Sequence, residues 1–360
     1  MKKSITLLLL PLLLFFISSC QKEVKVLTEG HSDNSILITN NEEGAKLIEY
    51  DIEKSAIIKE NFLDNEDVKG LKSIDKVYLN EDNITDDNYY ILSKVSLKIV
   101  SVDRFTDSTV AIYDFNEKGL IPTEIGFPNS SNIYVVHENS DVMTVVDVIN
   151  HDFGREIKIG QGGVSIVTFQ NELYIANKVD RTISRVKTNL KEEIDIFKIK
   201  HKEEGTSELY AFMPVDLIKS KAQDEDELII LTTGDTESEE SKARLIFMNR
   251  YTGQILRIIK IEDEGISSQD INTNQILLTQ SDWLFVATDF KFFRLNMETI
   301  GKLNVLNSMN ISSMFYTEED NRLVVLEEKG DFQNIRKISI GGASVVISRL
   351  NFEAGSILPL

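Results

Sequence analysis

The chain is poor in the residues that often stabilise small secreted proteins or hold metals. It has one cysteine, one tryptophan and five prolines in 360 residues. A single cysteine cannot form an intramolecular disulfide, and it excludes a metal site made of several thiolates. After the first twenty residues, no apolar run approaches the roughly 20 residues that a membrane-spanning helix needs. We therefore expect the main body of the chain to be a soluble domain without disulfides.

Recognisable catalytic and metal-binding motifs are also missing. The sequence has no G-x-S-x-G, no P-loop, no H-E-x-x-H and no EF-hand loop. Asp82, Asp86 and Asp87 lack the alternating ligand spacing of a calcium loop, so we interpret them as part of a turn. The four histidines are scattered at His31, His137, His151 and His201. The sequence thus predicts no cofactor, no metal site and no catalytic residue.

Basic residues are outnumbered by acidic ones. The 58 acidic and 39 basic residues give a net charge of −19. This balance opposes binding to nucleic acid, because that affinity comes mainly from Lys and Arg on phosphates. It also favours solubility. We predict no nucleic-acid partner, and we interpret the acid-rich stretches 224–227 and 237–240 as solvated loops.

The first twenty residues have the pattern of a secretory signal. Two lysines precede an apolar stretch over residues 5–17, and small residues then lead to a cysteine. Such a basic start, short apolar run and small-residue cleavage site are typical of a signal peptide, here residues 1–19. The segment Ile17-Ser18-Ser19-Cys20 resembles the lipobox of bacterial lipoproteins. The alternative is an ordinary signal peptide beside an unmodified cysteine.

The lipobox resemblance implies a membrane anchor and a location. In bacterial lipoproteins the cysteine carries a diacylglycerol and often a further acyl chain such as palmitate, so Cys20 is the expected lipid attachment site. Two or three acyl chains hold a protein stably on a bilayer. Gln21, by analogy, argues against retention at the inner membrane. We predict a protein of the bacterial cell envelope, anchored to the outer membrane and facing the periplasm or the outside. A lipidated leader would span residues 20–30 and a single domain residues 31–360.

The rest of the chain repeats one unit. Its clearest copies, Asn132–Asp147 and Glu172–Lys187, each have an apolar run, a polar loop and an alternating run. Alternation with period 2 turns one face of a strand toward a buried surface. Four short strands in roughly 40–45 residues are typical of a propeller blade. Seven copies are recognisable, at Ser35–Asp51, Tyr89–Asp103, Asn132–Asp147, Glu172–Lys187, Glu227–Gly253, Trp283–Asn296 and Arg322–Ser339.

Most copies end at a turn-forming residue. Asp and Asn side chains accept hydrogen bonds from backbone N–H groups two residues on, and so they start turns. Lys187 departs from this pattern, whereas Gly253 offers the positive φ that a hairpin often requires. Helical spacing fits only Ala211–Lys221, where Pro214 argues for a late start. The turn-forming residues are Asp51, Asp103, Asp147, Asn249 and Asn296.

The two best copies resemble the YVTN-type repeat family. The likeness lies in Tyr134-Val135-Val136-His137 with Val142–Asp147, in Tyr174-Ile175-Ala176-Asn177 with Thr182–Val186, and in the connector Ile159–Ile166. The family implies an all-β fold, a seven-bladed β-propeller of four-stranded antiparallel blades. Six or eight blades also fit if one copy is misread. Val24–Leu27 and Val345–Leu350 are the candidates for strands that close the ring.

Ligands of propellers favour the mouth of the central channel, where connections between blades and middle hairpin loops converge. The register places the loops 40–44, 137–141, 178–181, 232–242 and 288–289 at that face. His137 stands where the repeat usually has Asn, and its alternative role is structural. The candidate ligand-binding residues are His137, Asn139, Asp141, Asp180, Arg181 and Asp289.

Two functions remain open. The first is a non-catalytic module that binds a small-molecule ligand or a protein; similar lipoproteins of the YVTN-like family capture small molecules for a transporter, which would then be a partner. The second is an enzyme, a metal-dependent hydrolase or lactonase. Trp283 is the only tryptophan, and this disfavours the quinoprotein dehydrogenases, whose blades stack a recurrent tryptophan.

Overall fold

The chain divides into two units, residues 1–34 and residues 35–360. The computed structural model describes residues 35–40, 45–79, 87–189, 193–202, 209–220, 226–235, 242–262, 267–268, 270–299, 303–317, 321–350, 352 and 354–359. The predictions for the signal peptide, for lipidation at Cys20 and for the leader lie outside these residues. So do Val24–Leu27 and, in the predicted Asp turn, Asp82 and Asp86.

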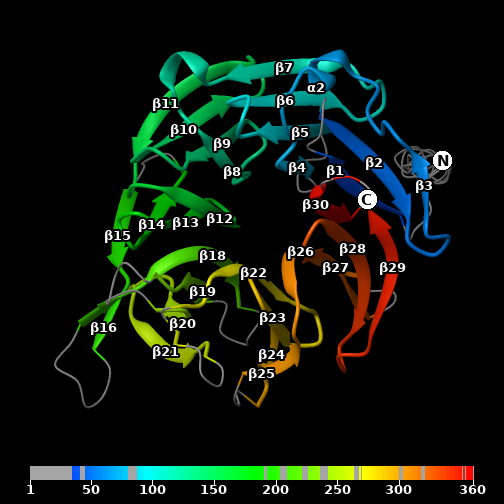
Figure 1. The fold of residues 1–360 in the computed structure, drawn as a ribbon. Coiled ribbons are helices and arrows are strands. Elements are labelled where there is room, and N and C mark those ends of the chain that lie inside the picture. The colour runs from blue at the N-terminus through cyan, green and yellow to red at the C-terminus, as the bar shows by residue number, and fades with distance from the viewer. Residues whose placement is uncertain are drawn as a thin grey trace, which may run out of the picture. The chain divides into compact units, whose positions relative to one another are not determined.

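The second unit is a seven-bladed β-propeller. Each blade is a four-stranded antiparallel sheet, and the blades follow one another in a ring (Figure 1). The seven predicted repeat copies are the second and third strands of the seven blades. The predicted fold class is thus confirmed, including the number of blades.

We number the blades 1 to 7 along the chain and give their strands from the channel outward. Blade 1 contains β30 (Ala354–Pro359), β1 (Ser35–Asn40), β2 (Lys46–Asp51) and β3 (Ala56–Lys59). Blade 2 contains β4 (Lys76–Leu79), β5 (Asn88–Ser93), β6 (Lys98–Asp103) and β7 (Thr109–Asp114). Blade 3 contains β8 (Pro122–Gly126), β9 (Asn132–His137), β10 (Val142–Asp147) and β11 (Asp152–Lys158). Blade 4 contains β12 (Gly163–Phe169), β13 (Glu172–Asn177), β14 (Thr182–Lys187) and β15 (Glu193–Lys198).

The remaining blades have the same order. Blade 5 contains β18 (Met213–Lys219), β19 (Glu227–Thr233), β20 (Arg244–Asn249) and β21 (Ile255–Lys260). Blade 6 contains β22 (Thr273–Leu278), β23 (Trp283–Thr288), β24 (Phe292–Asn296) and β25 (Asn304–Asn307). Blade 7 contains β26 (Asn310–Thr317), β27 (Arg322–Lys329), β28 (Phe332–Ser339) and β29 (Ser344–Leu350). A ribbon of β16 (Lys200–Lys202) and β17 (Leu209–Ala211) lies between blades 4 and 5 in the sequence.

Strands from both ends of the propeller unit close the ring. β30 pairs with β1, so the C-terminal strand is the innermost strand of blade 1. Val345–Leu350, one candidate for the closing blade, instead lies in β29 and pairs with β28 as the outer strand of blade 7. The sequence did not single out β30 because Ala354–Pro359 is short and lacks a clear period-2 alternation.

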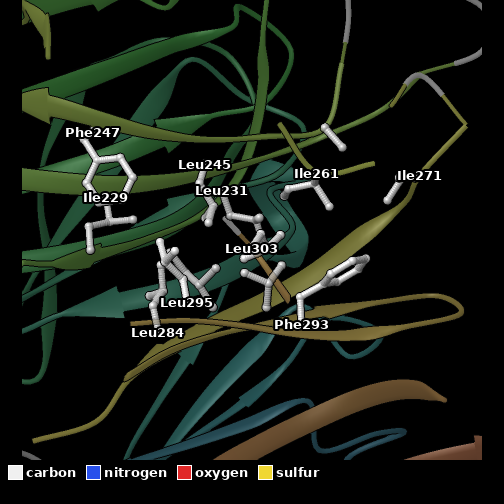
Figure 2. Close-up of a cluster of buried hydrophobic side chains, with 13 residues drawn as sticks. Ile229, Leu231, Leu245, Phe247, Ile261, Ile271, Leu284, Phe293, Leu295 and Leu303 are labelled. Atoms are coloured by element: carbon white, nitrogen blue, oxygen red, sulfur yellow. The ribbon is translucent and has the colours of Figure 1, made fainter. Parts of the chain in front are cut away.

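Apolar side chains between neighbouring blades form the core. Between blades 5 and 6, Ile229 and Phe247 lie opposite Leu284 and Leu295, all fully buried (Figure 2). These residues come from the apolar second strands and the alternating third strands, which correspond to the two predicted runs of each repeat copy. Burying one such side chain stabilises the fold by about 1.5–3 kcal/mol. A four-stranded blade cannot bury both faces alone, so each blade depends on its neighbours.

The predicted turns form at the ends of the third strands. Asp103 Oδ1 accepts hydrogen bonds from the backbone N–H groups of Phe105 (3.0 Å) and Thr106 (2.8 Å). The equivalent oxygens of Asp147, Asn249 and Asn296 accept from the residues two and three positions on, and Asp51 accepts from Lys54. At the exceptional corner, the Thr188 hydroxyl donates to Asn171 O instead. Gly253 has a φ of 69°, as its turn requires.

The helical prediction is wrong for Ala211–Lys221, whose main element is strand β18. Sheet pairing overrides the weak helical spacing because β19 offers a buried apolar partner along the whole strand. Two short helices were not predicted, α2 (Glu66–Lys69) and the 3-10 turn η1 (Asn116–Lys118). Asn65 caps α2 by accepting from Asp67 N and Val68 N. Among the described residues, no helix is long and apolar enough to cross a membrane.

The corner at Asp147 provides a test of the turn mechanism. We expect Asp147→Ala to lower the free energy of unfolding by about 0.5–2 kcal/mol, because two backbone N–H groups lose their acceptor. Asp147→Asn should cost much less, since asparagine makes the same bonds at Asn249 and Asn296. Urea unfolding measures both changes, and equal losses in the two variants would contradict the mechanism.

Candidate functional site: the central channel

The inner strands of all seven blades enclose a channel with a cavity of about 1010 Å³. We call the end with the loops between second and third strands the upper face, and the opposite end the lower face. Lys94, Glu138, Lys178 and Asp289 line the channel toward the upper face. Val167, Ile218 and Leu277 line it toward the lower face. The channel is therefore charged at one end and apolar at the other.

A bulge recurs in the inner strands. The pairing register shifts between Pro122 and Glu124 in β8 and between Gly163 and Ser165 in β12. Equivalent shifts occur in β18, β22 and β26, and the β1–β30 pair is also irregular. A bulge inserts one residue and redirects the side chain that follows it. The side chains after the bulges, here called the channel belt, are Glu124, Ser165, Asp216, Gln275 and Ser313.

The channel belt joins neighbouring blades through hydrogen bonds. Gln275 accepts from Met314 N (3.0 Å) and donates to Met314 O (3.2 Å), which joins blade 6 to blade 7. Ser313 accepts from Ile357 N (3.2 Å), which joins blade 7 to blade 1. Thr123 and Ser356 make comparable bonds, to Gly163 O (2.6 Å) and to Asp75 O (3.3 Å). Each bond satisfies a backbone group at the open edge of an inner strand, a group that would otherwise need water.

Asp216 connects three blades. Its Oδ1 accepts from the Ser165 hydroxyl of blade 4 at 2.8 Å and from Leu217 N at 2.9 Å, and its Oδ2 accepts from Ile276 N of blade 6 at 3.0 Å. Burial raises the pKa of this carboxyl to about 6, although these hydrogen bonds and the charge of Lys76 oppose the rise. The nearby Glu124 charge adds to it.

Blades 2 and 3 meet at an ion pair in the channel wall. The Lys76 ammonium and the Tyr78 hydroxyl both donate to the carboxylate of Glu124. Burial lowers the pKa of Lys76, but the attraction of Glu124 outweighs this and holds that pKa above its usual value. Burial and the Glu124 charge raise the pKa of Tyr78 well above its ordinary range. Lys76 therefore stays charged and Tyr78 stays neutral at physiological pH.

A smaller polar cavity adjoins the channel at the upper face between blades 4, 5 and 6. It has a volume of about 480 Å³, and its lining includes Lys178, Asp235, Asp270 and Asn272. Lys178 lines both this cavity and the channel. The upper end of the channel thus offers charged and amide groups on a scaffold of paired strands.

His137 lies inside blade 3. Its side chain is fully buried, Nε2 is 2.8 Å from the Thr144 hydroxyl, and its ring packs edge-on against Phe115 at 5.1 Å between centroids. Burial lowers the pKa of this imidazole to about 4, so it is neutral at physiological pH. The structural alternative for His137 accounts for these contacts, but Nδ1 of the ring is buried and has no hydrogen-bond partner among the described residues.

Three other predicted residues stabilise the loops that carry them. Asn139 accepts from Ile121 N (2.9 Å) and donates to Gly119 O (2.7 Å), which ties its loop to the connector from blade 2. Asp180 accepts from Gln161 N at 2.8 Å in the glycine-containing connector. Asp141 forms an exposed ion pair with Lys158 at 3.3 Å. These hydrogen bonds and this ion pair stabilise the loops of the upper face independently of any ligand.

Arg181 and Asp289 lie nearer to the upper cavities. Arg181 is 4.0 Å from Asp235 of blade 5. Asp289 lines the channel, and its Oδ2 accepts from Asn272 Nδ2 at 3.2 Å. Its other oxygen, Oδ1, is buried and has no hydrogen-bond partner among the described residues. The structure thus brings these two of the six predicted residues toward a common region without joining all six in one site.

Sequence reasoning missed the polar residues of the inner strands. Glu124, Asp216 and Gln275 lie in segments that are neither strongly apolar nor part of the best repeats. The only available signal was a polar residue within each inner strand, and it becomes meaningful only once the strands are known to line a channel. In the part of the chain that the structure describes, no three His, Cys, Asp or Glu side chains are placed to hold a metal ion.

No family model and no curated protein matches the sequence. Solved structures are similar in fold. They include a protein from Lactobacillus plantarum, with a TM-score of 0.64 and 12% identity over 90% of this chain and 98% of that one. A candidate 6-phosphogluconolactonase from Bacteroides fragilis has a TM-score of 0.63 and 11% identity over the same shares. A functionally unknown protein from Desulfotomaculum acetoxidans has a TM-score of 0.61 and 13% identity, also over 90% and 98%. At such identities the similarity shows the fold alone, and the YVTN-type and lipoprotein resemblances stay predictions.

The raised pKa of Asp216 makes its contribution to stability depend on pH. A carboxyl whose pKa rises from 3.8 to about 6 on folding stabilises the fold below pH 3.8, and this contribution is lost as the pH rises through 6. Because Asp216 keeps partial contact with the channel, we expect a loss of about 1–3 kcal/mol between pH 4 and pH 7. Asp216→Asn removes this pH-dependent contribution to the free energy of unfolding, because asparagine does not ionise.

Urea unfolding of both proteins at pH 4 and pH 7 checks the sign. The free energy of unfolding of the wild type, relative to Asp216→Asn, should fall as the pH rises. His137 titrates in the opposite direction but is present in both proteins, so it cancels in the comparison. A difference that stays constant with pH would show that Asp216 is not perturbed in the folded state.

Proposed function

We propose that the protein is a non-catalytic binding propeller, tethered by lipid at Cys20 to the bacterial cell envelope, which takes a small polar ligand at the upper mouth of its channel. The tether would place it at the outer membrane, where it could pass the ligand to a transporter. The fold supports a binding role because rigid strands hold loops in place at the rim of a cavity.

The buried Asp289 Oδ1 is the observation that carries the ligand site. A buried carboxylate oxygen without a partner costs free energy, so native proteins nearly always give it a donor. Asp289 Oδ1 has no such donor among the described residues, and Asp289 lines the channel. Rotation of the Asp289 carboxylate toward the channel would let a hydroxyl or amino group of a ligand supply the missing bond.

The surrounding groups define the chemistry of that ligand. Lys178 can donate to the ligand, while Asp235 and Asp270 can accept from it. Donors and acceptors of both charges around a cavity of about 480 Å³ favour a compact molecule with several hydroxyl or amino groups. A large apolar ligand would displace water from Lys178 and Asp270 without offering them hydrogen bonds, which is costly.

The alternative is a hydrolase or lactonase. It is favoured by the names of two structural neighbours, the candidate 6-phosphogluconolactonases of Bacteroides fragilis and Bacteroides uniformis. Under this alternative, the purified protein should contain a stoichiometric metal, and EDTA should lower its melting temperature. Under the binding proposal, elemental analysis should find less than about 0.1 metal per chain and EDTA should leave the melting temperature unchanged.

Ligand-observed NMR tests the site itself. We expect the protein to bind at least one member of a panel of monosaccharides, polyols and free amino acids. Asp289→Ala should weaken that binding at least tenfold, about 1.4 kcal/mol, because the ligand loses its acceptor. Asp331→Ala removes an exposed carboxylate from a turn of blade 7 and should have no effect. Absence of binding across the panel, or equal binding by Asp289→Ala, would contradict the proposed site.

Fractionation tests the tether separately. In a lipoprotein-processing bacterium, the wild-type protein should be found with the outer membrane and should incorporate labelled palmitate. Cys20→Ser should abolish the label and release the protein into the soluble fraction, since the acyl chains provide the membrane affinity. Membrane association that survives Cys20→Ser would refute the proposed anchor.

A further inference from the structure

A third cavity opens at the lower face, at the opposite end of the channel from the proposed ligand site. It has a volume of about 900 Å³ and lies where blades 4, 5 and 6 meet. Its walls come from the ends of β12, β18 and β22 and from the hairpin loops that contain Asn171 and Tyr251. A cavity of this size suits a small organic molecule.

The floor of this cavity is apolar. It is formed by Ile218 of β18 and by Ile276, Leu277 and Leu278 of β22, with Phe169 of β12 at the side. Ile218, Leu277, Leu278 and Phe169 each keep partial solvent exposure. The upper cavity lacks such a surface, because its lining is mainly Lys, Asp, Asn and Thr. The two ends of the channel therefore favour ligands of different polarity.

One wall of the lower cavity carries cationic side chains held by aromatic rings. The Arg250 guanidinium lies 4.5 Å from the ring centre of Phe169 and 4.2 Å from that of Tyr251. Lys219 Nζ lies 5.0 Å from the ring centre of Phe169. Cations at such distances are attracted to the faces of the rings. Tyr251 is 43% exposed, so part of its ring remains open to a ligand.

A network of ion pairs fixes this wall in position. Glu172 accepts from Arg185 at 2.5 Å, from Arg250 at 2.9 Å and from the Tyr174 hydroxyl at 2.9 Å. Burial raises the pKa of Glu172, but the hydrogen bonds from Arg185 and Tyr174 lower it by more. The net shift is therefore downward, and the carboxylate stays charged. Arg250 is only 12% exposed, and its geometry is set before any ligand arrives.

Lys219 has no ion-pair partner in this network. Arg185 pairs with Glu172 and Asp195, and Arg250 pairs with Glu172 and with Asp226 at 3.8 Å. Among the described residues, no carboxylate lies within ion-pair distance of Lys219 Nζ. An exposed ammonium beside an apolar floor attracts a molecule that has an acidic group next to a hydrophobic body.

We propose that the lower cavity is a second binding site, which takes an apolar ring or short chain that carries a carboxylate. The hydrophobic body would lie on Leu277 and Leu278, beside the open part of the Tyr251 ring, and the carboxylate would pair with Lys219. Asn171 and Asn189 at the rim can donate further hydrogen bonds to the acid. This site is independent of the polar ligand proposed for the upper face.

The test uses three probes that separate the two halves of the ligand. 3-Phenylpropionate has both a ring and a carboxylate, 3-phenylpropan-1-ol has the ring alone, and propionate has the acid alone. Calorimetry and saturation-transfer NMR should show the first probe binding at least tenfold more tightly than either of the others. Equal binding of 3-phenylpropionate and 3-phenylpropan-1-ol, or no binding of 3-phenylpropionate at millimolar concentration, would overturn the proposal.

Variants locate the binding. Lys219→Met keeps the alkyl stem but removes the charge, and it should weaken 3-phenylpropionate about tenfold while leaving 3-phenylpropan-1-ol unchanged. Leu278→Asn should weaken both ring-bearing probes. Lys198→Met, which removes an exposed charge from the outer strand of blade 4, is the matched control. An equal loss in Lys198→Met and Lys219→Met, with both variants folded by thermal melting, would place the binding elsewhere.

Discussion

Hydrogen bonds between the inner strands of neighbouring blades are the constraint on which the rest of this propeller depends. Apolar packing holds blades together but is non-directional, and it leaves the inner edge of every sheet with unpaired backbone groups. The bulges turn polar side chains sideways, toward the backbone of the next blade. Gln275 with Met314 and Ser313 with Ile357 show the pattern most clearly. The same device operates at the junction where β30 closes the ring, so closure uses the same chemistry as the other blade contacts.

This arrangement also sets what the channel can bind. Most polar groups in the middle of the channel wall join neighbouring blades, as Asp216 does. The groups that a ligand could contact therefore lie at the two ends of the channel. At the upper end, Asp289 has a carboxylate oxygen that the described residues do not satisfy. At the lower end, Leu277 and Leu278 face a cavity beside Lys219 and Tyr251. The rigid ring thus has two openings that differ in chemistry. The proposed lipid tether would attach only at the N-terminus.

The repeat pattern was sufficient to predict the fold, because apolar periodicity and turn residues depend on local sequence. The second and third strands, the seven blades and the turns at Asp103 and Asp147 all follow from it. The candidate site was harder to predict. His137 looked like a loop residue, yet β9 extends to include it and buries its ring. The local signal of Asp216 is only that of a polar residue within a strand, because its environment is made by β12 and β22 of the neighbouring blades. Contacts between blades depend on the curvature of the ring, which no single repeat encodes.

Amide hydrogen exchange at Ile276, Met314 and Ile357 tests the inter-blade bonds most directly. Each of these N–H groups donates to a side chain of the preceding blade. If those bonds hold the ring, the three amides exchange as slowly as the amides between strands within a blade. Gln275→Leu should then accelerate exchange at Met314 by at least tenfold and leave Ile357 nearly unchanged. Rapid exchange of all three amides in the wild type, or no change at Met314 in the variant, would contradict this account.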